Sequence, residues 1–522
     1  MCENKRFTKR CPKQMNSDPQ RTDPPNLRNG PLDTALPRIG TMLLLFASAA
    51  VFEAKNLSSL TSLSNGDIWW HLRTGIWILQ NHGVPHSGLF SQSPDLPWTA
   101  SSWAYDLLVA LGFRMQGLRS VPVMLMIFKL AFAVATFLLA GGLRGRFWPA
   151  VVLSATTQYI LGHVQPGPGY CSMLFFAVEL LLLNESRRRG VRFLFWLPPL
   201  FLVWANLDIQ FVFGILLLAL FLITSFLGKF GRSSAEHVQH KWVTVSPRNV
   251  GLIATLCGIA TLFTPYAYHL YGVFWGSVAS AANRYLPDFR AMSFRQPQDY
   301  VLMLLTMAAF LALGLRRSHD PFQIALMIGC TMLSFYAQGD AWLASLAAIA
   351  VISEAMSDDA IRNATGAVEA GHQRTWKGQI LIAGGLSVAI LLLAAALGIP
   401  GSQDALLAKA AQTYPVTACN YIREHQLPQP LFNPYEWGGF LTWYLPEYPV
   451  AIDGRTGLYD DDFVVQYFKA MNADVRYQAD PAMANAGTLL LQRRSLMGEA
   501  LRTLPTFRVA YSDSVAVVLI NP

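Results

Sequence analysis

The sequence carries little charge for its length. Of its 522 residues, 14% are charged and 53% are hydrophobic, and the mean hydropathy is +0.32. A soluble domain usually contains about 25% charged residues. A purely soluble protein is therefore excluded, and most of the chain is expected to face lipid.

Cysteine pairs and the common catalytic motifs are missing as well. The six cysteines show no CxxC spacing, so neither a zinc finger nor a disulfide framework is expected. The chain has no P-loop, no GxGxxG after a strand, no GxSxG and no HExxH. Nucleotide use, serine hydrolysis and zincin chemistry therefore have no local support. The net charge of +8 does not indicate nucleic acid, because Lys and Arg gather between apolar runs without interleaved aromatic residues.

Apolar runs, in contrast, are frequent. They include residues 39–52, 121–140, 209–227, 251–263, 300–315 and 380–399. Several reach the roughly 20 residues that a helix needs to cross about 30 Å of hydrocarbon. The basic clusters between them indicate cytoplasmic loops. This pattern predicts a polytopic α-helical membrane protein with about eleven transmembrane helices, or thirteen if the short run 103–115 is not an interfacial helix.

The topology divides the chain into three regions. Residues 1–38 are polar and basic and are expected to form a disordered cytoplasmic tail. Residues 39–399 form the transmembrane domain, with an external loop from about 55 to 120. Residues 400–522 alternate helical patterns with short β-rich stretches such as 450–452, which predicts a small α/β domain outside the cytoplasm. Cleavage near Ala47 as a signal peptide is the alternative for the first apolar run.

An ionisable cluster follows that first run. Asp67, His71 and Arg73 lie within two turns of a predicted helix, next to the paired Trp69 and Trp70. Ionisable residues at a membrane boundary indicate a functional site. The structural alternatives are that Asp67 only caps the helix and that the tryptophans only anchor it at the bilayer interface.

A metal at this cluster is the other alternative. Asp67 and His71 have an i, i+4 spacing that is repeated by His82 and His86, so a divalent metal is conceivable there. No third ligand is evident in the sequence, and no metal site is predicted.

Four motifs resemble the GT-C superfamily of integral membrane glycosyltransferases, in the group of protein mannosyltransferase-like and lipopolysaccharide-sugar transferase-like bacterial proteins. They are G-D-I-W-W-H-L-R-T-G-I-W-I-L with G-V-P-H at 66–86, W-A-N-L at 204–207, F-N-P-Y-E-W-G-G-F-L at 432–441 and A-I-D-G-R-T-G-L-Y at 451–459. The resemblance implies a bacterial cytoplasmic membrane protein with a cytoplasmic N-terminus. It implies inverting transfer of a sugar from a polyprenyl-phosphate donor to an envelope glycan, lipid or protein, without a cofactor.

The resemblance also implies roles for residues. In that superfamily an acidic residue of the first external loop commonly acts as the catalytic base, and Asp67 matches that position. The phosphate leaving group needs cationic donors, for which the candidates are His71, Arg73, His86, Arg284, Arg290 and Arg295. The outer arginines could equally contact lipid headgroups.

The chain departs from its relatives at two places. Asp208 stands where they often carry His-Gly after W-A-N-L, and it is a candidate substrate-binding residue or a solvated carboxylate at a helix end. Gln165-Pro166 stands where they often carry Arg-Pro. Two other functions therefore stay open. One is a transporter or flippase, although the sequence shows no internal repeat. The other is a non-catalytic relative that binds an envelope glycan or a partner.

Overall fold

The computed structural model describes residues 31–55, 61–142, 146–163, 167–230, 245–316, 320–363 and 369–521. Most of the predicted cytoplasmic tail therefore lies outside the described residues, as do Gln165, Pro166 and much of the basic stretch between 229 and 248. The first described helix, α1, begins at Pro31, before the predicted start of the first apolar run.

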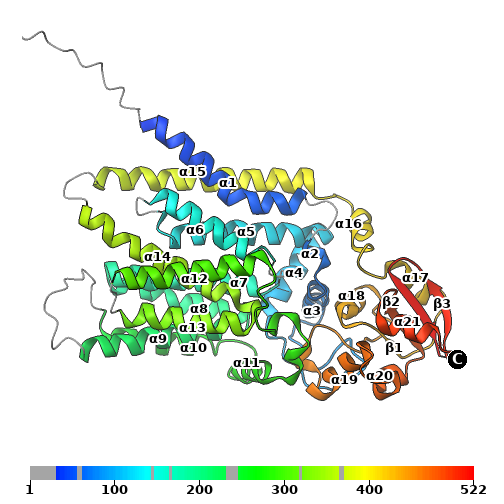
Figure 1. Ribbon diagram of the computed structural model, residues 1–522. Helices are drawn as coiled ribbons and strands as arrows, with labels where there is room; N and C mark the ends of the chain where they lie inside the picture. Colours follow the sequence, from blue (N-terminus) through cyan, green and yellow to red (C-terminus); the bar gives the residue numbers. More distant parts are fainter. Residues whose placement is uncertain are drawn as a thin grey trace, which may run out of the picture.

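Apolar helices run side by side and form a bundle (Figure 1). Helix α1 packs against α15 and α5, and α14 packs against α12 and α13. The bundle helices are α1 (Pro31–Lys55), α5 (Ser120–Leu139), α6 (Phe147–Ile160), α7 (Gly169–Arg189), α8 (Leu197–Leu207), α9 (Phe211–Phe230), α10 (Pro247–Ala260), α12 (Pro297–Leu315), α13 (Pro321–Tyr336), α14 (Ala341–Asn363) and α15 (Glu369–Gly398).

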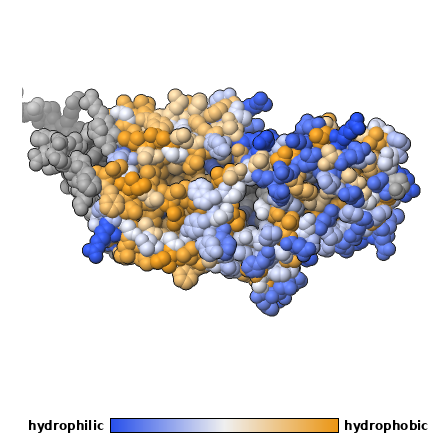
Figure 2. Space-filling view, turned by 90° about the horizontal axis from the view of Figure 1, so that it is seen from below, coloured by the Kyte–Doolittle hydropathy of each residue, from blue (hydrophilic) through white to orange (hydrophobic). Residues whose placement is uncertain are grey.

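The surface of this bundle is apolar. Among the described residues, four helical segments are long and apolar enough to cross a membrane, namely Trp103–Leu139, Pro297–Leu315, Gln338–Met356 and Gly378–Gly398. Large apolar side chains such as Leu311 and Leu392 are exposed on them. Figure 2 shows this hydrophobic surface over one half of the molecule and a hydrophilic surface over the other. These are the features of a multi-pass membrane protein, while the number of spans stays a prediction.

The segment 103–115, which was expected to lie at the interface, belongs to the first of these helical segments. Helix α4 (Trp103–Gln116) continues through the short η1 (Gly117–Arg119) into α5. It packs against α3 (Asp67–Asn81), α5 and α8. One face of α4 is therefore turned toward the interior, where Tyr105 and Asp106 are buried.

Short helices and loops gather at one end of the bundle, beside the C-terminal region (Figure 1). They include α3, the loop 82–102, α11 (His269–Ala279), η6 (Ala281–Arg284), η7 (Pro287–Phe289) and η8 (Gln338–Asp340).

The arginines at the end of α7 form ion pairs with other parts of the bundle: Arg187 pairs with Asp320 at 2.5 Å, and Arg188 pairs with Glu354.

Residues 403–520 form an α/β unit around a four-stranded sheet. Its order is β1-β2-β4-β3, and β1 and β2 are parallel while the other pairs are antiparallel. The strands are β1 (Leu431–Phe432), β2 (Thr488–Gln492), β3 (Arg508–Ser512) and β4 (Ala516–Ile520), and the larger helices are α16 (Gln403–Ala410), α17 (Val416–Glu424), α18 (Tyr435–Tyr444), α19 (Asp461–Met471) and α21 (Leu496–Arg502). The central strands β2 and β4 are buried, which explains their unbroken apolar runs.

The predicted strand at 450–452 is wrong. This stretch is not a strand of the described sheet, and Val450 instead forms a single parallel bridge to Ser91 in the loop that follows α3. The β-branched composition reflects burial against another part of the chain rather than a place in the sheet.

Candidate functional site

Asp67 is the first residue of α3. Its backbone amide donates to the side-chain oxygen of Asn65 at 3.0 Å, and the indole N–H of Trp70 donates to Asp67 Oδ1 at 3.1 Å. Gly66 occupies the N-cap position, and the first amide of α3 is bound by the side chain of Asn65 rather than by that of Asp67. The alternative in which Asp67 only caps its helix is therefore wrong.

The surroundings of Asp67 favour its neutral form. The carboxyl is half-buried, and this burial raises its pKa, while His71 and the hydrogen bond from Trp70 act in the opposite direction. The carboxylates of Asp288 and Asp453 face it and also raise the pKa. A carboxyl with a raised pKa at a cleft between segments is a common setting for proton transfer.

His71 is bound to a second carboxylate. Its Nδ1 lies 2.5 Å from Oδ1 of Asp106 on α4, and both side chains are buried. The close approach of the two helices depends on Gly75, because a Cβ at that position would collide with the carbonyl oxygen of Asp106. Asp106 was not predicted as a site residue. The signal that could have revealed it is a carboxylate within an apolar helix.

Arg73, on the same helix as Asp67, contacts the loop that follows α3. Its guanidinium lies 4.9 Å from the centre of the Phe90 ring, which is a cation–π geometry. Partial burial lowers its pKa, but a guanidinium remains charged. Its Nε is buried and has no hydrogen-bond partner among the described residues.

Asp208 belongs to the same end of the bundle. It lies in the turn between α8 and α9, accepts a hydrogen bond from Ser172 Oγ, and is only 4% exposed. Burial raises its pKa to about 6, and His71 faces it and lowers that value. The expectation of a merely solvated carboxylate is therefore wrong.

His86 is exposed at the edge of the cluster. Its ring meets Tyr266 edge-on at 5.2 Å, and Tyr266 in turn donates to the carbonyl oxygen of Pro85 at 2.7 Å. These contacts fix the G-V-P-H segment against the loop that follows α10. They leave the imidazole at the surface.

The three outer arginines do not join the cluster. Arg284, Arg290 and Arg295 are all exposed. Arg284 donates to the carbonyl oxygen of Ala281 at 3.2 Å, and Arg290 donates to that of Tyr285 at 3.0 Å. The charged residue of this loop that faces Asp67 is Asp288.

The C-terminal unit packs directly on α3. Trp69 contacts the rings of Tyr414, Phe440 and Trp443 at centroid distances of 5.7, 5.1 and 4.9 Å. A Cβ on Gly439 of α18 would collide with the carbonyl oxygen of Gly66. Gly439 of the motif at 432–441 therefore lies at the point where α18 meets the start of α3. Trp69 is a packing residue rather than an interface anchor.

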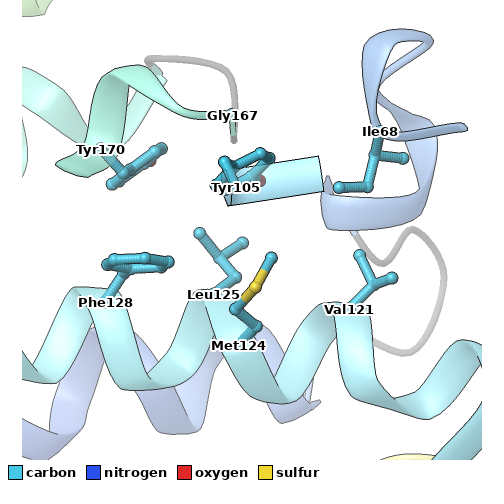
Figure 3. A pocket seen from close by; sticks show the side chains of 8 residues that line it. All are labelled: Ile68, Tyr105, Val121, Met124, Leu125, Phe128, Gly167 and Tyr170. Atoms are coloured by element: carbon cyan, nitrogen blue, oxygen red, sulfur yellow. The ribbon is translucent and has the colours of Figure 1, made fainter. Parts of the chain in front are cut away.

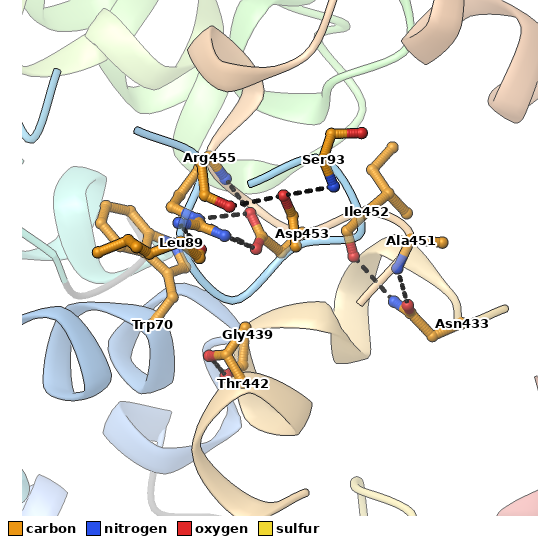
Figure 4. Close-up of polar contacts among 12 residues, drawn as sticks. Trp70, Leu89, Ser93, Asn433, Gly439, Thr442, Ala451, Ile452, Asp453 and Arg455 are labelled. Carbon is orange, nitrogen blue, oxygen red and sulfur yellow. Dashed lines mark hydrogen bonds and ion pairs between the residues drawn. The ribbon is translucent and has the colours of Figure 1, made fainter. Parts of the chain in front are cut away.

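The turn at 453–455 completes this contact (Figure 4). The Asp453 carboxylate accepts from Arg455 Nη2 at 2.7 Å and from Nε at 3.0 and 3.1 Å. Arg455 Nη1 donates to the carbonyl oxygen of Leu89 at 2.7 Å, and the guanidinium lies over Trp98 at 4.8 Å. Asp453 and Arg455 are buried. The structure brings this turn to Asp67.

An apolar pocket opens beside the cluster (Figure 3). It reaches Ile68, the neighbour of Asp67, and Tyr105, the neighbour of Asp106, and it extends along α5. Its lining consists of Ile68, Tyr105, Val121, Met124, Leu125, Phe128, Gly167 and Tyr170. Ionisable groups therefore adjoin a hydrophobic groove at the end of the bundle.

The donor set does not suit a metal ion. Among the described residues, no group of three or more His, Cys, Asp or Glu side chains could hold one. The i, i+4 pairs noted in the sequence do not converge on a further ligand, because His71 is bound to Asp106 and His86 lies at the surface.

No protein-family model matches the chain, and no curated protein matches it. The solved structures that are similar to it include the following two. The first is ArnT from Cupriavidus metallidurans bound to undecaprenyl phosphate, with 14% identity, a TM-score of 0.44, and coverage of 94% of this chain and 98% of that one. The second is the apo oligosaccharyltransferase from Archaeoglobus fulgidus, with 13% identity, a TM-score of 0.48, and coverage of 88% and 69%. Both are GT-C glycosyltransferases. At these scores the chemistry has to be inferred from the residues of this chain.

Proposed function

We propose that this protein is a membrane glycosyltransferase that moves a sugar from a polyprenyl-phosphate donor to an envelope acceptor, outside the cytoplasm, with Asp67 as the base. One observation carries the proposal. A half-buried carboxyl with a raised pKa stands at the end of an apolar bundle, beside a small hydrophobic pocket and on the same helix as a guanidinium with an unpartnered donor.

The first step is the activation of the acceptor. Asp67 in its ionised form accepts the proton of the acceptor hydroxyl as that oxygen bonds to the anomeric carbon. The hydrogen bond from Trp70 fixes one carboxylate oxygen, so the other is available to the acceptor. The raised pKa makes Asp67 a stronger base than an ordinary aspartate.

The second part of the same step is the departure of the lipid phosphate. The bond between the anomeric carbon and the phosphate oxygen breaks, and the electron pair leaves with that oxygen. The buried Nε of Arg73 is a preorganised donor for the resulting charge. The small pocket along α5 presents an apolar lining next to the site, where the isoprenoid chain of the donor would leave water. Arg284, Arg290 and Arg295 are better suited to lipid headgroups, because they are exposed and lie apart from Asp67.

The test is Asp67→Asn in the full-length protein, with Asp95→Asn as the matched control in the same external loop. Asp95 is exposed, so its replacement should change nothing. Lipid-linked sugars and envelope glycans are measured by mass spectrometry in cells that lack the gene and carry each variant. Asp67→Asn should abolish the product while expression and membrane insertion stay normal. A flippase or a non-catalytic relative would give the same product in the Asp67→Asn variant as in the wild type, and that result would refute the base.

A further inference from the structure

Gly454 lies against the carboxylate of Asp67. A Cβ built on Gly454 would collide with Asp67 Oδ1 and would lie 3.0 Å from Trp70 Nε1. Its φ is not in the left-handed region, so the backbone conformation does not require a glycine there. The position requires a glycine because the main chain approaches a side chain of the site, and that side chain is the proposed base.

The turn that carries Gly454 cannot easily retreat. Arg455 joins it to the Asp453 carboxylate and to the carbonyl oxygen of Leu89. On the other side, Asn433 accepts from the amide of Ala451 at 2.8 Å and donates to the carbonyl oxygen of Ile452 at 2.8 Å. The residues on both sides of Gly454 are therefore fixed by buried hydrogen bonds.

The external loop is fixed to the same turn. Gln92 N donates to the carbonyl oxygen of Val450 at 2.9 Å, and Val450 N donates to that of Phe90 at 3.1 Å. Asp67, by comparison, is half-buried, and the only side-chain donor recorded for it among the described residues is Trp70. A side chain added at position 454 would therefore displace Asp67 rather than the turn.

We propose that Gly454 is the positioning residue for Asp67, so that the C-terminal unit forms one wall of the site. Gly454 acts through Asp67 and does not itself touch substrate. The inference rests on the proposed function for its catalytic meaning, but the contact between the two residues can be tested without any substrate.

The substrate-free test is a double-mutant cycle in thermal stability. The full-length variants Gly454→Ala, Asp67→Ala and the combination are purified in detergent, and their Tm values are measured. Gly454→Ala should lower Tm by several degrees, because a buried clash forces side chains or backbone to shift. In the Asp67→Ala background the same substitution should cost almost nothing, since the remaining approach to Trp70 needs only a small adjustment.

Gly457→Ala is the matched control. Gly457 lies in the same segment, and a Cβ there would meet nothing within 4 Å. Its effect on Tm should be small and the same in both backgrounds. If Gly454→Ala does not yield folded protein, the combination with Asp67→Ala should recover it. Equal losses from Gly454→Ala in both backgrounds would overturn the inference.

A transfer assay separates this inference from the proposed function. In cells that make the product, Gly454→Ala should reduce it roughly 100-fold, as expected for a base displaced by about 1 Å, while Gly457→Ala leaves it unchanged. Absence of any product in the wild type would refute the proposed function and leave the Tm coupling intact. Loss of the coupling with normal product in Gly454→Ala would refute the positioning role alone.

Discussion

His71 Nδ1 lies 2.5 Å from Oδ1 of Asp106, and this pair is buried between α3 and α4. A carboxylate bound to Nδ1 orients an imidazole ring and determines which nitrogen is left for other contacts. His71 also faces Asp67 and Asp208, and it lowers the pKa of both. The imidazole therefore lies between the proposed base and two carboxylates from other segments, Asp106 on α4 and Asp208 in the turn after α8.

Replacement of Asp106 by Asn should weaken transfer without removing it. The amide has the same size and still offers an oxygen to His71 Nδ1, but it lacks the negative charge that holds the imidazole and its proton in place. We expect the rate to fall roughly 10- to 100-fold, less than the 10²–10⁴ that a general base itself supplies. The measurement is product formed per unit of protein, with Asp95→Asn as the control because Asp95 is exposed in the adjoining loop. Equal rates for the two variants would mean that the pair has no part in the reaction.

Trp70→Phe should shift the pH dependence of transfer. Trp70 donates to Asp67 and lowers its pKa, so removal of the indole N–H raises that pKa further. A base must be ionised, and activity therefore increases as pH rises through the pKa of Asp67. The acidic limb of the rate profile should move to higher pH in the variant. The charged groups that face Asp67 are His71, Asp288 and Asp453.

The profile is measured over a full pH range, with Trp77→Phe as the control because Trp77 is also on α3 but outside this cluster. An unchanged acidic limb in Trp70→Phe would show that Asp67 does not control the rate.

Asp453→Ala should destabilise the protein more than removal of both partners of the ion pair. Asp453 and Arg455 have no exposed side-chain surface, so the single substitution leaves a buried charge without its partner and should cost about 3–5 kcal/mol. The double variant Asp453→Ala, Arg455→Ala should recover part of this loss. The comparison is made from unfolding midpoints of the full chain.

The exposed pair of Arg423 and Glu447 provides the reference for that experiment. Its side chains are 39% and 47% exposed, and an exposed pair contributes about 0–1 kcal/mol. Glu447→Ala should therefore have little effect. Similar losses for Asp453→Ala and Glu447→Ala would contradict the structural role assigned to the buried pair.

Arg73→Met should reduce transfer strongly, whereas Arg284→Met should not. Arg73 has a buried donor without a partner among the described residues, and the loss of one preorganised donor to a developing anion costs roughly 10²–10³ in rate. Arg284 is exposed, and its Nε donates to the carbonyl oxygen of Ala281. Rates are compared at the same expression level in membranes. A larger loss of rate for Arg284→Met than for Arg73→Met would mean that the segment around Arg284, rather than Arg73, binds the leaving phosphate.

The sequence was sufficient to predict a helical membrane protein and to bring together one half of the candidate site. Apolar composition and basic clusters indicate a membrane bundle, and the ionisable residues around Asp67 are close together in the chain. The structure keeps Asp67, His71 and Arg73 on one helix. Local spacing could predict this because residues that are a few positions apart in a helix lie within one or two turns of each other.

The other half depends on contacts that local patterns do not record. Arg455 and Leu89 are 366 residues apart, and nothing in the spacing of either segment points to the other. The outer arginines were candidates because of their charge, but a sequence does not show the direction of a side chain. Asp106 was assigned to an interfacial helix because one carboxylate in an apolar stretch does not reveal the histidine that neutralises it.

The pairing of Ser91 with Val450 has a consequence for biosynthesis. Chains are made and exported from the N-terminus, and domains generally fold in that order. The loop 82–102 therefore waits for a partner that is synthesised much later. Chains interrupted before Val450 would lack this contact, so the candidate site would stay unassembled until the C-terminal unit has been made.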